Sequence, residues 1–184
     1  MKFTETTIAG AYVIEPERLV DERGFFARLF CERELAEHGL ESRIVQSGIS
    51  FNPRQGTLRG LHYQDAPHAE TKFVRCTQGA IYDVIVDLRP ASATRYRWHA
   101  VELSAENRHT LYIPKGLAHG FITLQPDTEV LYQMSEYHHA AAARGIRWDD
   151  PLLQIDWPEH PSIISERDAN YPLLECERGA TIPG

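Results

Sequence analysis

Cysteine is scarce in this sequence, and its few cysteines are not arranged as a pair. Cys31, Cys76 and Cys176 lie far apart, and no C-x-x-C motif is present. An odd number of distant cysteines argues against a disulfide framework and against a cysteine-rich zinc site. We therefore expect reduced thiols and a cytoplasmic protein.

Long apolar runs and an excess of positive charge are also missing. No segment approaches the length that spans a membrane, and the first residues, MKFTETTIAGAYVIEPERL, have no apolar core of a signal peptide. The formal net charge is −7, from 19 Lys and Arg against 26 Asp and Glu. This balance argues against nucleic-acid and anionic-membrane partners, while a local cluster of Arg and Lys would still bind a small anion.

Strand patterns occupy much of the chain. The segment GAIYDVIVDLRP, residues 79–90, alternates between an apolar face and a mixed face that carries Asp83. The preceding TKFVRCTQG ends in a turn signal, so we expect these two segments to form a hairpin. YRWHAVELS, HTLYIP, GFITLQ and TEVLYQMS are further short strands. Many short strands in 184 residues predict a single all-β domain, a sandwich or barrel.

Helical patterns are rare. ERELAEHGL, residues 32–40, predicts one short amphipathic helix that ends at Gly39. ISERDANYPLL, residues 164–174, predicts one helical turn, whereas PLLQIDWPEHP has too many prolines for regular structure. Residues 175–184 are expected to form a flexible tail.

Two histidines raise the question of a metal site. His62 and His119 lie in GTLRGLHYQ and IPKGLAHGF, two segments similar to the ligand motifs of cupin metalloproteins. In those proteins a second histidine follows the first, but this chain has Gln64 there, which leaves two imidazoles and Glu70 as a further group. Lys72 lies close by in the sequence, and its charge would oppose a bound cation. We therefore expect a cupin-like scaffold without a metal.

Acid–base chemistry is the alternative for the same residues. Histidine accepts protons near neutral pH and works better when a carboxylate orients its far nitrogen, for which Asp83 and Asp168 are candidates. Lys72 would supply positive charge where an oxyanion develops, and Tyr132 would donate a proton from the opposite side. A base, an oxyanion stabiliser and a separate acid are the groups needed to remove and replace a proton next to a ketone.

Seven motifs between about Asp21 and Pro172 carry a family resemblance. They are DERGFF, GTLRGLHYQ, KFVRCTQGAIYDVIVDLRP, YIPKGLAHGF, EVLYQMSEY, GIRWDDP and ISERD. Their sequence and order resemble the dTDP-4-dehydrorhamnose 3,5-epimerase family. The resemblance implies a jelly-roll domain of the cupin superfamily, usually a homodimer, that uses no cofactor and no metal. It also implies a nucleotide-linked 4-keto-6-deoxyhexose as the substrate.

The resemblance further assigns roles to residues. It implies that His62 is the base, Asp168 its carboxylate partner, Lys72 the group that stabilises the enolate and Tyr132 the acid. The predicted substrate-binding residues are Arg23, Phe26, Gln46, Arg59, Asp83, His119, Tyr137 and Arg167. The predicted catalytic set is intact, and it agrees with the acid–base interpretation of His62, Lys72 and Tyr132.

Departures from the family pattern gather at the nucleotide end. Arg28 replaces a Glu, Gly48 an Asn, His138 a Tyr and Ala143 an acidic residue. Three alternatives to a dTDP-linked 3,5-epimerase therefore stay open. The chain could use another nucleotide (CDP, GDP or UDP), invert only one of the two carbons, or bind sugar nucleotides with lapsed chemistry. A ketoisomerase is disfavoured because such relatives lack an acid at the position of Tyr132.

Overall fold

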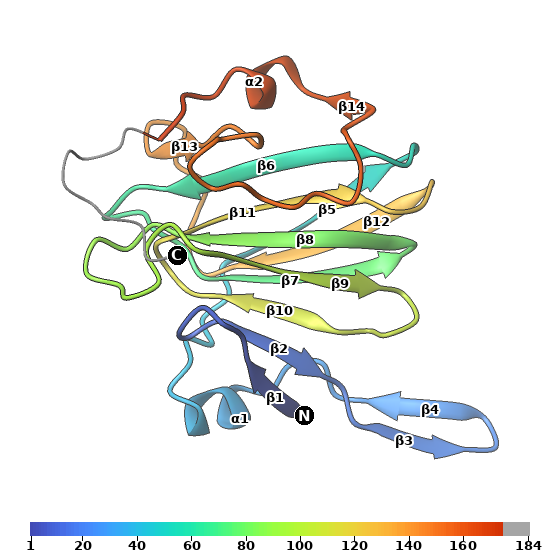
Figure 1. The fold of residues 1–184 in the computed structure, drawn as a ribbon. Coiled ribbons are helices and arrows are strands. Elements are labelled where there is room, and N and C mark those ends of the chain that lie inside the picture. Colours follow the sequence, from blue (N-terminus) through green and yellow to red (C-terminus); the bar gives the residue numbers. More distant parts are fainter. Residues whose placement is uncertain (175–184) are drawn as a thin grey trace.

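Two antiparallel sheets face each other in a computed structural model that describes residues 1–174 (Figure 1). The predicted tail at 175–184 lies outside the described residues. The first sheet has the order β1 (Lys2–Glu5), β2 (Tyr12–Glu15), β10 (Thr110–Ile113), β7 (Lys72–Gln78), β12 (Thr128–Met134) and β5 (Gln46–Asn52). The second has the order β13 (Ala143–Gly145), β6 (Thr57–Gln64), β11 (Leu117–Thr123), β8 (Ala80–Asp87) and β9 (Trp98–Ser104). This arrangement confirms the predicted jelly roll.

Three smaller pieces complete the fold. β3 (Arg18–Asp21) and β4 (Gly24–Ala27) form a two-stranded arm, and β14 (Ile163–Ile164) pairs parallel with β6. The short helices α1 (Glu32–Glu37) and α2 (Glu166–Ala169) confirm the two predicted helical segments. α1 is followed by Gly39 with φ of +69°, a left-handed conformation that glycine adopts without steric cost.

Alternating apolar residues of both sheets form the main core. Ile81 and Ile85 of β8 pack against Val74 and Cys76 of β7 and against neighbours from other strands. The opposite face of β8, with Val84 and Val86, is also buried, because residues 146–157 cover it. Asp83 lies on the same face as Ile81 and Ile85, so the predicted mixed face places a carboxylate inside the sandwich.

The hairpin predicted for residues 71–90 is wrong. β7 pairs with β10 and β12, whereas β8 pairs with β9 and β11 in the other sheet. Gly79 alone separates the two strands, and a single residue is too short for a hairpin loop. A Cβ at Gly79 would lie 2.3 Å from the Thr128 hydroxyl, so the chain turns from one sheet to the other at a position that requires glycine.

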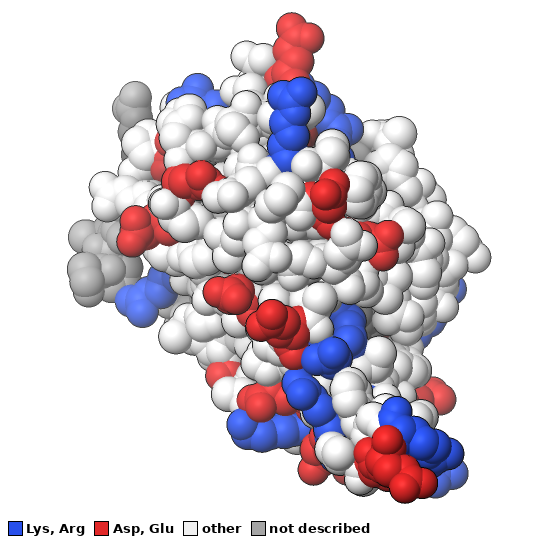
Figure 2. Space-filling model, turned by 90° about the vertical axis from the view of Figure 1, so that its right-hand side faces the viewer, with Lys and Arg blue, Asp and Glu red and all other residues white. Residues whose placement is uncertain are grey.

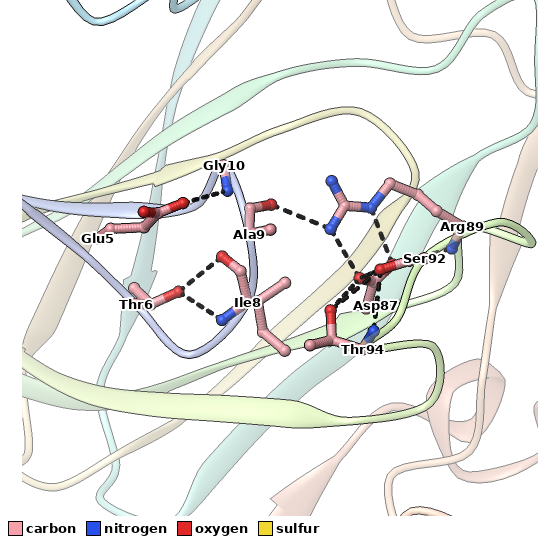
Figure 3. Close-up of polar contacts among 9 residues, drawn as sticks. All are labelled: Glu5, Thr6, Ile8, Ala9, Gly10, Asp87, Arg89, Ser92 and Thr94. Atoms are coloured by element: carbon pink, nitrogen blue, oxygen red, sulfur yellow. Dashed lines mark hydrogen bonds and ion pairs between the residues drawn. The ribbon is translucent and has the colours of Figure 1, made fainter.

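A buried carboxylate fastens the loop after β8 (Figure 3). Asp87 accepts hydrogen bonds from the Arg89 guanidinium at 2.7 and 2.9 Å, from Ser92 Oγ at 2.6 Å and from Thr94 Oγ1 at 2.7 Å. Arg89 also donates to the Ala9 carbonyl, which connects this loop to the chain before β2. Burial alone would raise the pKa of Asp87, but these hydrogen bonds outweigh it and lower the pKa to about 2.

The β3–β4 arm projects from the body of the molecule (Figure 1). Several of its large apolar side chains are exposed. Leu19, Val20 and Phe26 are 69%, 76% and 67% exposed. On the face that carries the arm, positive and negative side chains are interspersed and lie side by side at the lower end (Figure 2). Exposed apolar side chains gathered on a projecting ribbon are typical of a surface that a partner covers.

Neither α1 nor α2, the helices of the described residues, has the length and apolar character needed to cross a membrane.

Candidate active site

A cavity of about 280 Å³ opens between the two sheets. Five of the twelve predicted site residues line it: Gln46, His62, Lys72, Tyr132 and Arg167. His62 comes from β6 of the second sheet, whereas Lys72 and Tyr132 come from β7 and β12 of the first sheet. The predicted base therefore faces the predicted enolate stabiliser and acid across the cavity.

A register shift in β6 decides which side chains point inward. His62 is the partner of His119 on β11, and Arg59 is the partner of Phe121, with an irregularity between the two pairs. His119 and Phe121 are two residues apart, so they lie on one face of β11. Their partners Arg59 and His62 therefore share the inner face although three positions separate them. Simple alternation would place Arg59 and His62 on opposite faces.

Asp168 holds the imidazole of His62 in place. Asp168 Oδ1 lies 2.9 Å from His62 Nε2, and Oδ2 accepts a hydrogen bond from the Gly60 backbone N–H at 3.1 Å. Ser165 caps α2 by accepting from the backbone N–H of Asp168, which fixes the position of the carboxylate. Burial would raise the pKa of Asp168, but the bonds from His62 and Gly60 lower it overall, so the carboxylate stays ionised at neutral pH.

A second histidine–carboxylate pair lies deeper in the sandwich. His119 Nε2 is 2.7 Å from Asp83 Oδ1, and both side chains are buried. Burial raises the pKa of Asp83, and among the described residues its Oδ2 has no hydrogen-bond partner. The imidazole of His119 meets the ring of Tyr132 edge-on, with 6.3 Å between the ring centres. Through His119 this pair packs against Tyr132, and neither His119 nor Asp83 lines the cavity.

Lys72 is held by two acceptors. Its Nζ lies 3.0 Å from Glu70 Oε1 and donates to the His62 carbonyl at 3.3 Å. Gln64 in turn binds the other oxygen of Glu70. Glu70 is thus the partner of Lys72, a role that the sequence did not indicate, since it was considered only as a metal ligand.

Tyr132 is arranged to keep its proton. Burial raises the pKa of Tyr132 far above its ordinary value, and the buried Asp83 adds to this effect. Ser50 Oγ lies 3.3 Å from the phenol oxygen and Arg59 is also near enough to act on it, and both effects oppose the rise. A phenol in this setting is protonated at neutral pH and can serve as a proton donor.

No three His, Cys, Asp or Glu side chains within residues 1–174 are grouped so that they could hold a metal ion. His62 and His119, the two histidines of the cupin-like motifs, each bind a different carboxylate through Nε2.

Four further predicted site residues do not line the cavity. Arg59 borders a neighbouring groove of about 380 Å³ together with Asp168, and its Nε donates to Asn52 Oδ1 at 2.7 Å. Tyr137 is 53% exposed. Arg23 and Phe26 lie on the β3–β4 arm, where Arg23 pairs with Asp21 at 2.5 Å. A single chain does not bring Arg23 and Phe26 to His62, and their binding role stays a prediction.

Three of the four residues that depart from the family pattern line the cavity. Gly48, His138 and Ala143 line it, and the His138 backbone N–H donates to Gln46 Oε1 at 2.7 Å. Arg28 lies elsewhere, where it pairs with Glu34 at 2.6 Å. The cavity wall also contains residues that the sequence did not single out: Ile49, Tyr63, Met134, Glu136, Arg144 and Tyr171. Strand alternation could have indicated some of these, but nothing local marks Tyr171, which follows α2.

Comparisons with known proteins identify the family of the chain. The family model described as dTDP-4-dehydrorhamnose 3,5-epimerase matches residues 5–175. A curated enzyme of that name from Methanothermobacter thermautotrophicus is 46% identical over 178 residues, which cover 95% of each chain. A crystal structure of the Bacillus anthracis enzyme with TDP and PPi bound superposes with a TM-score of 0.90 at 44% identity, covering 94% of this chain and 99% of that one. The Legionella pneumophila enzyme in complex with dTDP-4-keto-L-rhamnose gives a TM-score of 0.87 at 38% identity, covering 94% and 92%.

The jelly roll and the matches to curated and solved relatives define an isomerase of the sugar-nucleotide epimerase class. The chain belongs to the dTDP-4-dehydrorhamnose 3,5-epimerase family, because the family model spans nearly its whole length.

Proposed function

We propose that the chain inverts C3 and C5 of a dTDP-linked 4-keto-6-deoxyhexose, with His62 as the base and Tyr132 as the acid. The observation that carries this proposal is their placement on facing sheets, on opposite sides of one cavity. Inversion requires that a proton leaves one face of a carbon and that another arrives on the opposite face. Two groups on one wall would return the proton to the face it left.

The first step breaks a C–H bond next to the ketone. Since Nε2 of His62 is bound to Asp168, Nδ1 is the nitrogen that takes the proton, and the ionised carboxylate stabilises the imidazolium that forms. The electron pair of the C–H bond moves to the C4 oxygen as an enolate. The Lys72 ammonium lies in the wall of the cavity and stabilises that negative charge.

The second step returns a proton from the other wall. Tyr132 donates its phenolic proton to the carbanionic carbon while the enolate collapses to the ketone. The imidazolium then releases its proton to water and the phenolate regains one, which restores the starting state. Substrate binding is assigned to Gln46, Arg59 and Arg167, whose donors lie in the cavity or in the adjoining groove.

A different nucleotide is the second candidate, and one observation favours it. Gly48, His138 and Ala143 differ from the family pattern and all line the cavity, where a nucleoside would be recognised. Inversion of a single carbon uses the same base and acid and is an outcome of the same test. A sugar-nucleotide-binding module with lapsed chemistry is disfavoured because the four proposed catalytic residues are present and paired.

We further propose a homodimer in which the arm of one protomer reaches the cavity of the other. Arg23 and Phe26 are predicted substrate ligands, yet in one chain they project away from the cavity on an exposed ribbon. Ile49 and Phe51 of the edge strand β5 are 64% and 51% exposed, and Ile49 also lines the cavity. An apolar arm and an apolar cavity rim fit a self-complementary interface.

A cytoplasmic location remains part of the proposal. It is supported by Cys31 and Cys76, which are free in the described part of the chain, as expected of a protein in a reducing compartment.

The test of this function is incubation with dTDP-4-keto-6-deoxyglucose in deuterium oxide, followed by proton NMR. Loss of the C3 and C5 proton signals with inverted stereochemistry is the expected result. Exchange at one carbon would make the protein a single-centre epimerase. Absence of exchange with the dTDP sugar, together with exchange in a CDP-, GDP- or UDP-linked ketosugar, would overturn the nucleotide assignment.

A further inference from the structure

Tyr171 forms a contact with His62 that the mechanism above does not use. The Tyr171 ring lies edge-on to the His62 imidazole, with 5.8 Å between ring centres and 72° between ring planes. Tyr171 lines the cavity together with His62. It follows α2 by two residues, so the segment that supplies Asp168 also supplies this ring.

Gly145 makes room for the Tyr171 ring. Gly145 is the register partner of His62 on β13, so it lies directly beside the proposed base. A Cβ added at Gly145 would lie 2.3 Å from two carbon atoms of the Tyr171 ring, which is far too close for the present arrangement. The absence of a side chain at this position therefore allows the ring to lie beside the imidazole.

We infer that Tyr171, seated on Gly145, is a positioning residue that fixes the plane of the His62 imidazole for proton abstraction. This inference rests on the proposed function of His62. The hydrogen bond from Nε2 to Asp168 fixes one end of the imidazole but leaves it free to turn about that bond. An edge-to-face contact with a second ring restricts this rotation and directs Nδ1 into the cavity.

The ring and not the hydroxyl is expected to matter, which provides a matched pair of variants. Tyr171→Phe keeps the ring and should retain kcat within about twofold. Tyr171→Leu keeps apolar bulk but removes the edge-to-face contact, and should lower the kcat for deuterium exchange about tenfold or more with a smaller change in KM, because misorientation affects the reacting geometry. Equal losses in both variants would assign the effect to the hydroxyl and overturn the inference.

Gly145→Ala supplies an independent test of the inference. The new methyl group must displace the Tyr171 ring, so this variant should lose activity to a similar extent as Tyr171→Leu. Combined with Tyr171→Leu, the same alanine should cause little further loss, since the ring that it displaces is already gone. Additive losses in the double variant would mean that the two residues act separately.

A measurement without substrate separates this inference from the proposed function. NMR of the His62 ring protons should show a ring-current shift in wild-type protein and Tyr171→Phe that disappears in Tyr171→Leu. Tyr82→Leu is the control, because it removes an edge-to-face contact with Trp157, 6.2 Å between ring centres, on the far side of the second sheet. It should leave kcat and the His62 signals unchanged.

The possible failures are thus distinguishable. If wild-type protein exchanges no deuterium with any ketosugar, the proposed function fails, whatever the His62 signals show. If wild-type protein is active but Tyr171→Leu matches it in kcat or leaves the His62 signals unmoved, the positioning role of Tyr171 is wrong.

Discussion

His62 and His119 are register partners on neighbouring strands, yet their Nε2 atoms bind different carboxylates. His62 turns to Asp168 of the C-terminal helix α2, and His119 turns to Asp83 of β8. In this arrangement His62 is 33% exposed beside the cavity, whereas His119 is buried. The two imidazoles therefore belong to two separate histidine–carboxylate pairs, of which one faces the cavity.

Replacement of His62 by alanine should abolish proton exchange at both carbons. The variant lacks the only group assigned to remove the proton, while Lys72 and the binding residues are unchanged. Binding of the sugar nucleotide, measured by calorimetry, should therefore be nearly as tight as in wild-type protein. Exchange at a wild-type rate would show that another group is the base.

Tyr132→Phe should separate abstraction from inversion. Proton removal by His62 survives, so deuterium should still enter the substrate, but reprotonation from the opposite wall fails. NMR in deuterium oxide should show exchanged substrate with little inverted product. If the variant inverts its substrate at the normal rate, Tyr132 is not the acid.

Asp168→Asn should lower kcat/KM by about 100-fold or more, since general-base catalysis by histidine depends on the partner that orients it and stabilises the imidazolium. The amide can still accept the Gly60 N–H, so the fold is expected to survive. Circular dichroism and kinetics on the same preparation test both parts. Asp149→Asn, at an exposed carboxylate paired with Arg147, is the control that should retain activity.

Stability in acid should depend on Asp87. Its folded pKa is about 2, below the ordinary value of 3.8, so its stabilising contribution is fully present above pH 4 and is lost as the pH falls toward 2. The difference in unfolding free energy between wild-type protein and Asp87→Asn should be large at pH 7 and shrink by about 1 kcal/mol between pH 5 and pH 3. Urea unfolding at several pH values measures it, and a constant difference would contradict the depressed pKa.

Subunit mixing tests whether the arm acts on the partner's cavity. Phe26→Ala and His62→Ala homodimers should each have low activity. Unfolding and refolding them together should restore part of the activity, because some mixed dimers contain one cavity with both an intact base and an intact arm. No recovery, in a preparation where mass spectrometry detects mixed dimers, would contradict the proposal that the arm serves the partner.

The sequence by itself determined the class of fold and the family. Short alternating strands required a layered all-β core, and the ordered motifs around His62, Lys72 and Tyr132 identified the family. These features are local, since strand period, turn residues and motif spacing are written along the chain.

Only the tertiary structure decided which strands pair and which groups meet. The hairpin across Gly79 was wrong because one residue carries the chain from one sheet to the other, which local turn signals do not reveal. The register shift in β6 places Arg59 and His62 on one face, against simple alternation. Asp168 and Tyr171 reach His62 from more than 100 positions away in the sequence, as the hydrogen bond at a separation of 106 shows for Asp168. Such contacts arise from the packing of whole sheets and segments, so their physical cause is not contained in any short stretch of sequence.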